Sequence, residues 1–146
     1  MKKVIILTSI VLTTAFFSQV NAQAEAQRLE LCTKVAGNTF LSSYTINLEQ
    51  PSGGGRQQPF KQALLMRKGN MYKFTVCTDD ESTGEAYLEL YDEGKRIGST
   101  YNASTGKIFQ SFEFECNKSA TYVIFVKIKD EKKGSAISVL SHVKTL

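Results

Sequence analysis

Two apolar runs separated by a short polar break, at residues 108–128, constrain the fold of this chain more than any other stretch. In the first run Phe112, Phe114 and Cys116 alternate with polar residues, which is typical of a strand with one buried and one exposed face. In the second run, residues 121–128, apolar side chains occupy both parities, which predicts a central strand buried on most of both faces. We therefore expect a β-hairpin at the centre of an antiparallel β-domain.

The N-terminus has the features of a secretory signal peptide. Lys2 and Lys3 precede an apolar run at residues 4–17, and the residues up to Ala22 or Ala24 suit cleavage by a signal peptidase. The run is too short for a membrane span, although a retained N-terminal anchor is the alternative. Because no cysteine follows the run directly, we expect an exported protein, periplasmic or secreted, that has no lipid anchor and no membrane span.

The balance of charges argues against a nucleic-acid partner. Without Lys2 and Lys3, the 18 basic residues of the chain fall to 16, against 14 acidic residues. The basic residues are scattered among the acidic ones, whereas a nucleic-acid surface needs them clustered. A domain of this length can bury a core without the help of disulfides.

One helix and eight strands are predicted after the signal peptide. Residues 24–36 carry apolar side chains at helical spacing, and Gly37 suits the end of a helix. The expected organisation is a signal peptide at 1–22, a helical segment at 23–38 and an all-β sandwich at 39–146. The expected strands are residues 44–48, 60–67, 71–78, 86–92, 96–101, 108–116, 121–128 and 135–143.

Three segments carry a family resemblance. The first is a turn with glycine before an aromatic strand, and the second is a Leu-x-Leu-Tyr-Asp strand. The third is a turn of the pattern Ser/Thr-Gly-x-Tyr that leads into a buried strand. Their residues are Lys68, Gly69, Tyr72, Phe74, Leu88, Leu90, Tyr91, Asp92, Ser119, Ala120 and Tyr122. The segments resemble the bacterial pre-peptidase C-terminal domain, although Ala120 replaces the usual glycine and the last strand lacks its usual tyrosine. Over residues 40–143 the resemblance implies an eight-stranded antiparallel jelly-roll-like sandwich. The chain also resembles small stand-alone secreted proteins of this type in Bacteroidetes.

No catalytic constellation is visible in the sequence. His142 is the only histidine, no Gly-x-Ser-x-Gly motif is present, and the cysteines lack zinc-ligand spacing. Catalysis needs a geometric arrangement and not a residue type. We therefore expect a protein that is not an enzyme, with a hydrolase as a remote alternative.

Four acidic residues in one loop are the candidate metal ligands, and they are Asp79, Asp80, Glu81 and Glu85. Calcium needs several oxygen ligands at one point, and the resemblance implies calcium because some family members bind it near such loops. The alternative is a set of solvated loop charges, which is the usual state of a surface loop. No other cofactor is expected.

Tyr87, Tyr91 and Tyr101 are expected on one outer face of the sandwich, where stacked aromatic rings could hold a sugar. The chain has no tryptophan, the residue that such platforms favour. The alternative is cross-strand aromatic pairing that stabilises the sheet.

The three cysteines leave at least one unpaired in an exported monomer. Cys116 shares the inward parity of Phe114, whereas Cys77 has the opposite parity to Phe74. In the jelly-roll order implied by the resemblance, Cys77 and Cys116 would close antiparallel neighbours at opposite ends, too far apart for a disulfide. We therefore expect Cys32 to pair with Cys116, which would hold the helix over one end of the core, and Cys77 to be free. The alternative is three reduced, buried cysteines.

These expectations together describe an exported, non-catalytic binding or interaction module. Its partner would be an envelope or extracellular protein. The alternative is a carbohydrate-binding module that uses the outward tyrosines, with a glycan as ligand.

Overall fold

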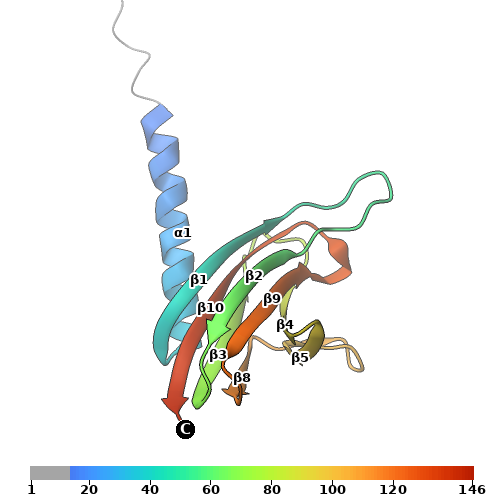
Figure 1. The fold of residues 1–146 in the computed structure, drawn as a ribbon. Helices are drawn as coiled ribbons and strands as arrows, with labels where there is room; N and C mark the ends of the chain where they lie inside the picture. The colour runs from blue at the N-terminus through green and yellow to red at the C-terminus, as the bar shows by residue number, and fades with distance from the viewer. Residues whose placement is uncertain (1–13) are drawn as a thin grey trace, which may run out of the picture.

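The computed structural model of the protein describes residues 14–146 (Figure 1). Within them, one helix precedes ten strands, so the predicted all-β class is confirmed, while the predicted number of eight strands is wrong. The elements are α1 (Thr14–Ala36), β1 (Thr39–Leu48), β2 (Phe60–Met66), β3 (Asn70–Thr78), β4 (Ala86–Asp92), β5 (Lys95–Ser99), β6 (Tyr101–Asn102), β7 (Lys107–Ile108), β8 (Ser111–Cys116), β9 (Ala120–Ile128), the 3-10 turn η1 (Lys129–Glu131) and β10 (Gly134–Thr145).

The first part of the predicted signal peptide, residues 1–13, lies outside the described residues. The remainder of it, from Thr14, belongs to α1. No helix between residues 14 and 146 combines the length and the apolar character that crossing a membrane requires.

Two four-stranded antiparallel sheets face each other in a sandwich-like arrangement. The first sheet has the order β1-β10-β3-β8 and the second has the order β2-β9-β4-β5, while β6 and β7 form a two-stranded ribbon. Side chains that alternate inward from both sheets meet in the core, where Phe74, Leu88 and Ile124 are fully enclosed. In the strands predicted from alternation, the side chains that the sequence placed on the inward face are therefore the ones that face the core.

The predicted hairpin between β8 and β9 is wrong. β8 pairs with β3 in the first sheet, whereas β9 pairs with β2 and β4 in the second. Residues 117–119 therefore carry the chain from one sheet to the other. Alternation shows which face of a strand is buried, and it does not show which strand lies beside it. The prediction that β9 is central in its sheet is confirmed.

A small buried polar cluster holds this crossing together. The Tyr122 hydroxyl donates a hydrogen bond to the Lys118 carbonyl oxygen at 2.7 Å and lies 3.8 Å from the Cys116 sulfur. Burial, together with the neighbouring Cys116 thiol, raises the pKa of Tyr122 to about 12. The hydroxyl therefore stays protonated and keeps donating across the physiological range.

The helix α1 begins ten residues before the predicted start, and it lies on the outer face of the first sheet, over β10 and β3. Its last turns are buried, where Cys32 and Ala36 pack against Ile137 and Val139, while Glu25 earlier in the helix accepts a hydrogen bond from Thr45 of β1. Residues 21–27 are exposed, and Figure 1 shows the upper part of α1 extending beyond the sheets. Gly37, with a φ of +59°, ends the helix as predicted.

The predicted pairing of Cys32 with Cys116 is wrong, because Cys32 bonds to Cys77 with the Cα atoms 5.8 Å apart. The helix lies on the outer face of the first sheet and not over one end of the core, so it reaches the outward-facing Cys77. Cys116 points into the core and forms no disulfide. Cys77 and Cys116 do lie at opposite ends of neighbouring strands, since Cys116 pairs with Asn70 and Cys77 lies next to the last residue of β3.

Candidate ligand-binding face

The outer surface of the second sheet carries a group of aromatic and charged side chains that contact one another. We call this surface the aromatic face. It consists of Lys61, Tyr87, Glu89, Tyr91, Arg96, Tyr101, Val123, Phe125 and Lys127. Inward residues such as Leu88 and Leu90 anchor β4 in the core, so its alternate residues must point outward. The register then places Glu89 opposite Phe125 on β9, and Phe125 opposite Lys61 on β2.

The three predicted tyrosines lie in two places on this face. Tyr87 and Tyr101 contact each other, with ring centroids 5.0 Å apart. Tyr91 lies four residues after Tyr87 on β4 and meets Phe125 edge-to-face, with centroids 5.2 Å apart and planes at 78°. The sequence reasoning missed Phe125 as a partner, although its parity opposite to the buried Ile124 could have indicated it.

A hollow of about 510 Å³ lies beside the Tyr91–Phe125 pair. Lys61 and Lys127 form part of its wall, together with Thr121 and Val123. Small-molecule sites are commonly concave, with a volume of roughly 300–1,000 Å³, mostly apolar walls and a few polar groups. The hollow has this composition, and its rings and cations come from β2, β4 and β9, which the core holds rigidly.

A buried carboxylate forms the floor of the aromatic face. Glu89 is only 4% exposed, although it points to the outer side of the sheet. Its oxygens accept hydrogen bonds from Lys127 Nζ at 2.8 Å, from the Tyr91 hydroxyl at 2.9 Å and from Arg96 at 3.3 Å. One anion therefore fixes two cations and an aromatic ring in defined positions.

The protonation states of this group follow from these contacts. Burial by itself would raise the pKa of Glu89, but the hydrogen bonds and charges of Lys127, Tyr91 and Arg96 outweigh burial and lower it. Burial and the hydrogen bond to Glu89 raise the pKa of Tyr91. At neutral pH, Glu89 is therefore ionised while Tyr91 remains a hydrogen-bond donor.

The lowered pKa of Glu89 predicts a pH-dependent contribution to stability. The contribution is present above the unfolded-state value near 4.5 and is lost as the pH falls through the lower folded-state pKa. At pH 7, Glu89→Gln should lower the free energy of unfolding by about 1–3 kcal/mol, the usual range for hydrogen bonds to a charged group. Urea denaturation of the parent protein and of Glu89→Gln, repeated below pH 4.5, should show a smaller difference between their free energies of unfolding.

The exposed Glu113 on β8 provides the matched control, because Glu113→Gln removes a carboxylate that faces solvent. This variant should match the parent protein at every pH. Equal pH dependence in the two variants would contradict the role given to Glu89.

The four candidate calcium ligands do not converge. Glu81 and Glu85 are exposed, as is Asp80, while Asp79 forms an ion pair with Arg28 of α1. Within residues 14–146, no three acidic, histidine or cysteine side chains are arranged to hold a metal ion. Asp79 therefore acts in the structure as an anchor for the helix.

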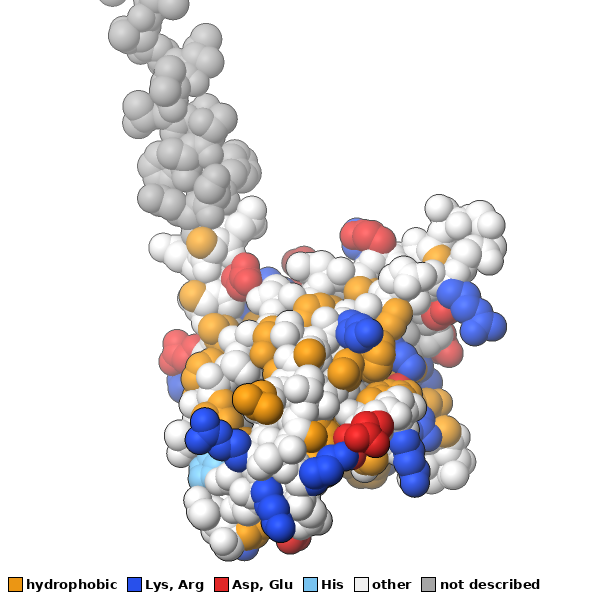
Figure 2. All heavy atoms as spheres, in the orientation of Figure 1, with side chains coloured by type: hydrophobic (Ala, Val, Ile, Leu, Met, Phe, Trp, Pro, Cys, Tyr) orange, Lys and Arg blue, Asp and Glu red, His pale blue; other side chains and the backbone are white. Residues whose placement is uncertain are grey.

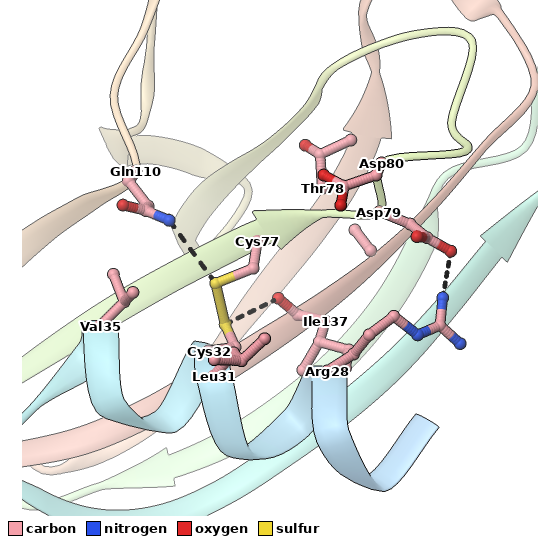
Figure 3. A pocket seen from close by; sticks show the side chains of 11 residues that line it. Arg28, Leu31, Cys32, Val35, Cys77, Thr78, Asp79, Asp80, Gln110 and Ile137 are labelled. Atoms are coloured by element: carbon pink, nitrogen blue, oxygen red, sulfur yellow. Dashed lines mark hydrogen bonds and ion pairs between the residues drawn. A yellow bond between two sulfur atoms is a disulfide. The ribbon is translucent and has the colours of Figure 1, made fainter. Parts of the chain in front are cut away.

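A second, smaller hollow of about 210 Å³ lies between α1 and the first sheet (Figure 3). The Cys32–Cys77 disulfide forms its floor, and Leu31 and Val35 of α1 line it. These two side chains remain 62% and 49% exposed. Apart from the closed Arg28–Asp79 ion pair, this hollow is lined mostly by apolar side chains, with Asp80 as a further carboxylate, so it offers no free cation to a ligand among the described residues.

The single histidine, His142, is engaged in packing. Its Nε2 atom lies 3.1 Å from Asn70 Oδ1, and its ring meets Tyr72 edge-on. These partners hold the imidazole at the end of β10 against β3. On the side of the molecule shown in Figure 2, Lys and Arg side chains are dispersed among hydrophobic and polar ones and form no continuous basic surface.

No family model matches the chain, and no curated protein matches its sequence.

Proposed function

We propose that this protein is an exported, non-catalytic binding module that takes a glycan on its aromatic face. The observation that carries the proposal is the hollow of about 510 Å³ beside the Tyr91–Phe125 pair. Aromatic rings present flat apolar surfaces to the C–H groups of a sugar, while nearby polar groups select its orientation. Lys61, Lys127 and Thr121 are placed to supply those polar contacts.

The order of the strands supports a jelly-roll architecture for this module. If the short strands β6 and β7 are left out, the first sheet contains the first, eighth, third and sixth strands. The second sheet contains the second, seventh, fourth and fifth. This order corresponds to that of a jelly roll, which supports the architecture that the resemblance to the pre-peptidase C-terminal domain implies.

Export to the periplasm or the exterior is supported by the disulfide and by the N-terminal sequence. Disulfides such as Cys32–Cys77 persist in oxidising compartments. Cleavage after Ala22 would remove only part of α1, because the contacts described between α1 and the first sheet are made by Glu25 and by residues beyond Gln27. The helix would therefore remain docked in the processed protein.

Association with an envelope or extracellular protein is a second candidate function. The observation that favours it is the pair of exposed apolar residues on α1, Leu31 and Val35, beside the smaller hollow. Exposed apolar groups that border a groove commonly mark protein contacts. This surface lies on the opposite side of the sandwich from the aromatic face.

The two candidates make opposite predictions for two variants. Tyr91→Ala should weaken glycan binding about tenfold or more, the usual cost of truncating an aromatic anchor, and should leave protein capture unchanged. Leu31→Ala should weaken protein capture and leave glycan binding unchanged. A glycan array and a pull-down from an envelope fraction, both with the exported protein, measure the two effects.

Phe40→Ala is the matched control for the loss of an aromatic ring, because Phe40 is an exposed aromatic residue on β1 of the other sheet. Its glycan binding should equal that of the parent protein. If Tyr91→Ala binds every glycan and every captured partner as the parent does, the aromatic face is not the binding surface.

A further inference from the structure

The charges on the aromatic face are unequal in number. Three cations, Lys61, Lys127 and Arg96, surround the Tyr91–Phe125 pair, and one carboxylate, that of Glu89, serves two of them. The third cation, Lys61, lies over the Phe125 ring at 5.8 Å, and no carboxylate pairs with it within residues 14–146.

The acidic residues at one end of the hollow offset only part of this surplus, because two carboxylates share one lysine there. Glu93, which lines the hollow, and its neighbour Asp92 are both paired with Lys118, at 3.5 Å and 2.9 Å. These four cations and three carboxylates leave one net positive charge, and the cation without a carboxylate among the described residues is Lys61, beside the Phe125 ring.

From this juxtaposition we propose that the ligand of the aromatic face is an acidic glycan built from carboxylated sugars. This inference rests on the proposed glycan-binding function and adds the chemical class of the sugar. The sugar packs against the Tyr91–Phe125 pair, with its face on one of the two rings, while its carboxylate accepts hydrogen bonds from the surrounding cations.

Glu89 acts as a positioning residue for this recognition. It holds Lys127 Nζ at 2.8 Å and Arg96 at 3.3 Å, yet the two cationic side chains remain 34% and 53% exposed. An ammonium group has three donors and a guanidinium has five, so each cation can serve Glu89 and a second anion together. Because the cations are already ordered, a bound carboxylate loses less free energy to the ordering of side chains.

The arrangement of charges also argues against the other hollow as the site of an anionic ligand. There Arg28 is paired with Asp79, and the remaining lining is largely apolar. An anion would have to displace Asp79 to reach the guanidinium. At the aromatic face no carboxylate needs to leave.

The test compares an oligogalacturonate with the same oligosaccharide after its carboxyl groups have been reduced to alcohols. The two probes share ring size and linkage and differ in charge. Calorimetry with the full exported protein should show tighter binding of the acidic probe at low salt. The preference should shrink in about 0.5 M NaCl, where charges are screened over a few ångströms. Lys61→Gln should weaken the acidic probe about two- to fivefold and leave the reduced probe unchanged.

Lys144→Gln is the matched control, since Lys144 is an exposed lysine on β10 of the other sheet, and it should bind both probes as the parent does. Equal affinity for the two probes, with loss of both in Tyr91→Ala, would overturn the acidic class and leave glycan binding intact. Binding of neither probe would also overturn this inference, and the glycan array then decides the proposed function separately. If Lys61→Gln and Lys144→Gln lose the same affinity for the acidic probe, only the net charge of the protein matters, and the aromatic face is not the site of acidic-sugar recognition.

Discussion

Replacing both Cys32 and Cys77 by serine is expected to lower the free energy of unfolding by about 4 kcal/mol, because the disulfide closes a loop of 45 residues. In the chain-entropy account, the bond restricts the unfolded chain. The docking of α1 should suffer most, since few other side chains bury it against the first sheet. Urea denaturation gives the free energy of unfolding, and faster hydrogen exchange of the α1 amides would report that the helix has left the first sheet.

The core between the sheets should remain folded in this double variant, because it contains no residue of α1. Cys116→Ala is the control: it removes the unpaired cysteine and keeps the disulfide, so reduction should still destabilise it. Peptide mapping without reductant should recover a Cys32–Cys77 peptide. A peptide that joins Cys116 to either cysteine would contradict the structure.

The sequence predicted the strands well because alternation at a period of two directly reports burial. Tyr72, Phe74 and Val76 were expected inward on β3 and are buried there. The pairing of strands is a different kind of information. Residues 117–119 look like a hairpin turn, yet they connect two sheets, and nothing local in the sequence distinguishes the two outcomes.

The disulfide was predicted wrongly because the helix was misplaced, although the parities of the cysteines were assigned correctly. The outward parity of Cys77 was visible in the sequence, and so was the inward parity of Cys116. A helix that covers the outer face of a sheet can bond only to an outward cysteine. The prediction failed because it placed the helix over one end of the core instead of across the sheet face.

The candidate site could be predicted in part for the same reason. The outward positions of Tyr87 and Tyr91 follow from alternation along β4. The contact of Tyr91 with Phe125 and the burial of Glu89 depend on the register between β4 and β9. Register is a long-range property, so a single sequence could not supply it.

The two outer faces of the sandwich have different roles in this architecture. The face of the first sheet is partly covered by α1, which the disulfide and the Arg28–Asp79 ion pair fasten down. The face of the second sheet carries the rings and cations on rigid strands, and no helix within residues 14–146 packs over them. A ligand that binds there meets a surface already ordered by the core, which favours affinity.

Ile124→Ala is expected to lower the free energy of unfolding by about 2–5 kcal/mol, because large-to-small changes in a packed core lose apolar contacts and leave a cavity. Ile124 is buried on the central strand β9, between β2 and β4. Phe114→Ala should fall near the lower end of this range, because Phe114 is only partly buried, with its ring edge-on to Tyr122 at 5.4 Å. Glu113→Ala, at an exposed position of β8, should stay within about 0.5 kcal/mol. Urea denaturation of the three variants gives the comparison, and a larger loss in Glu113→Ala than in Phe114→Ala would mean that β8 presents its other face to the core.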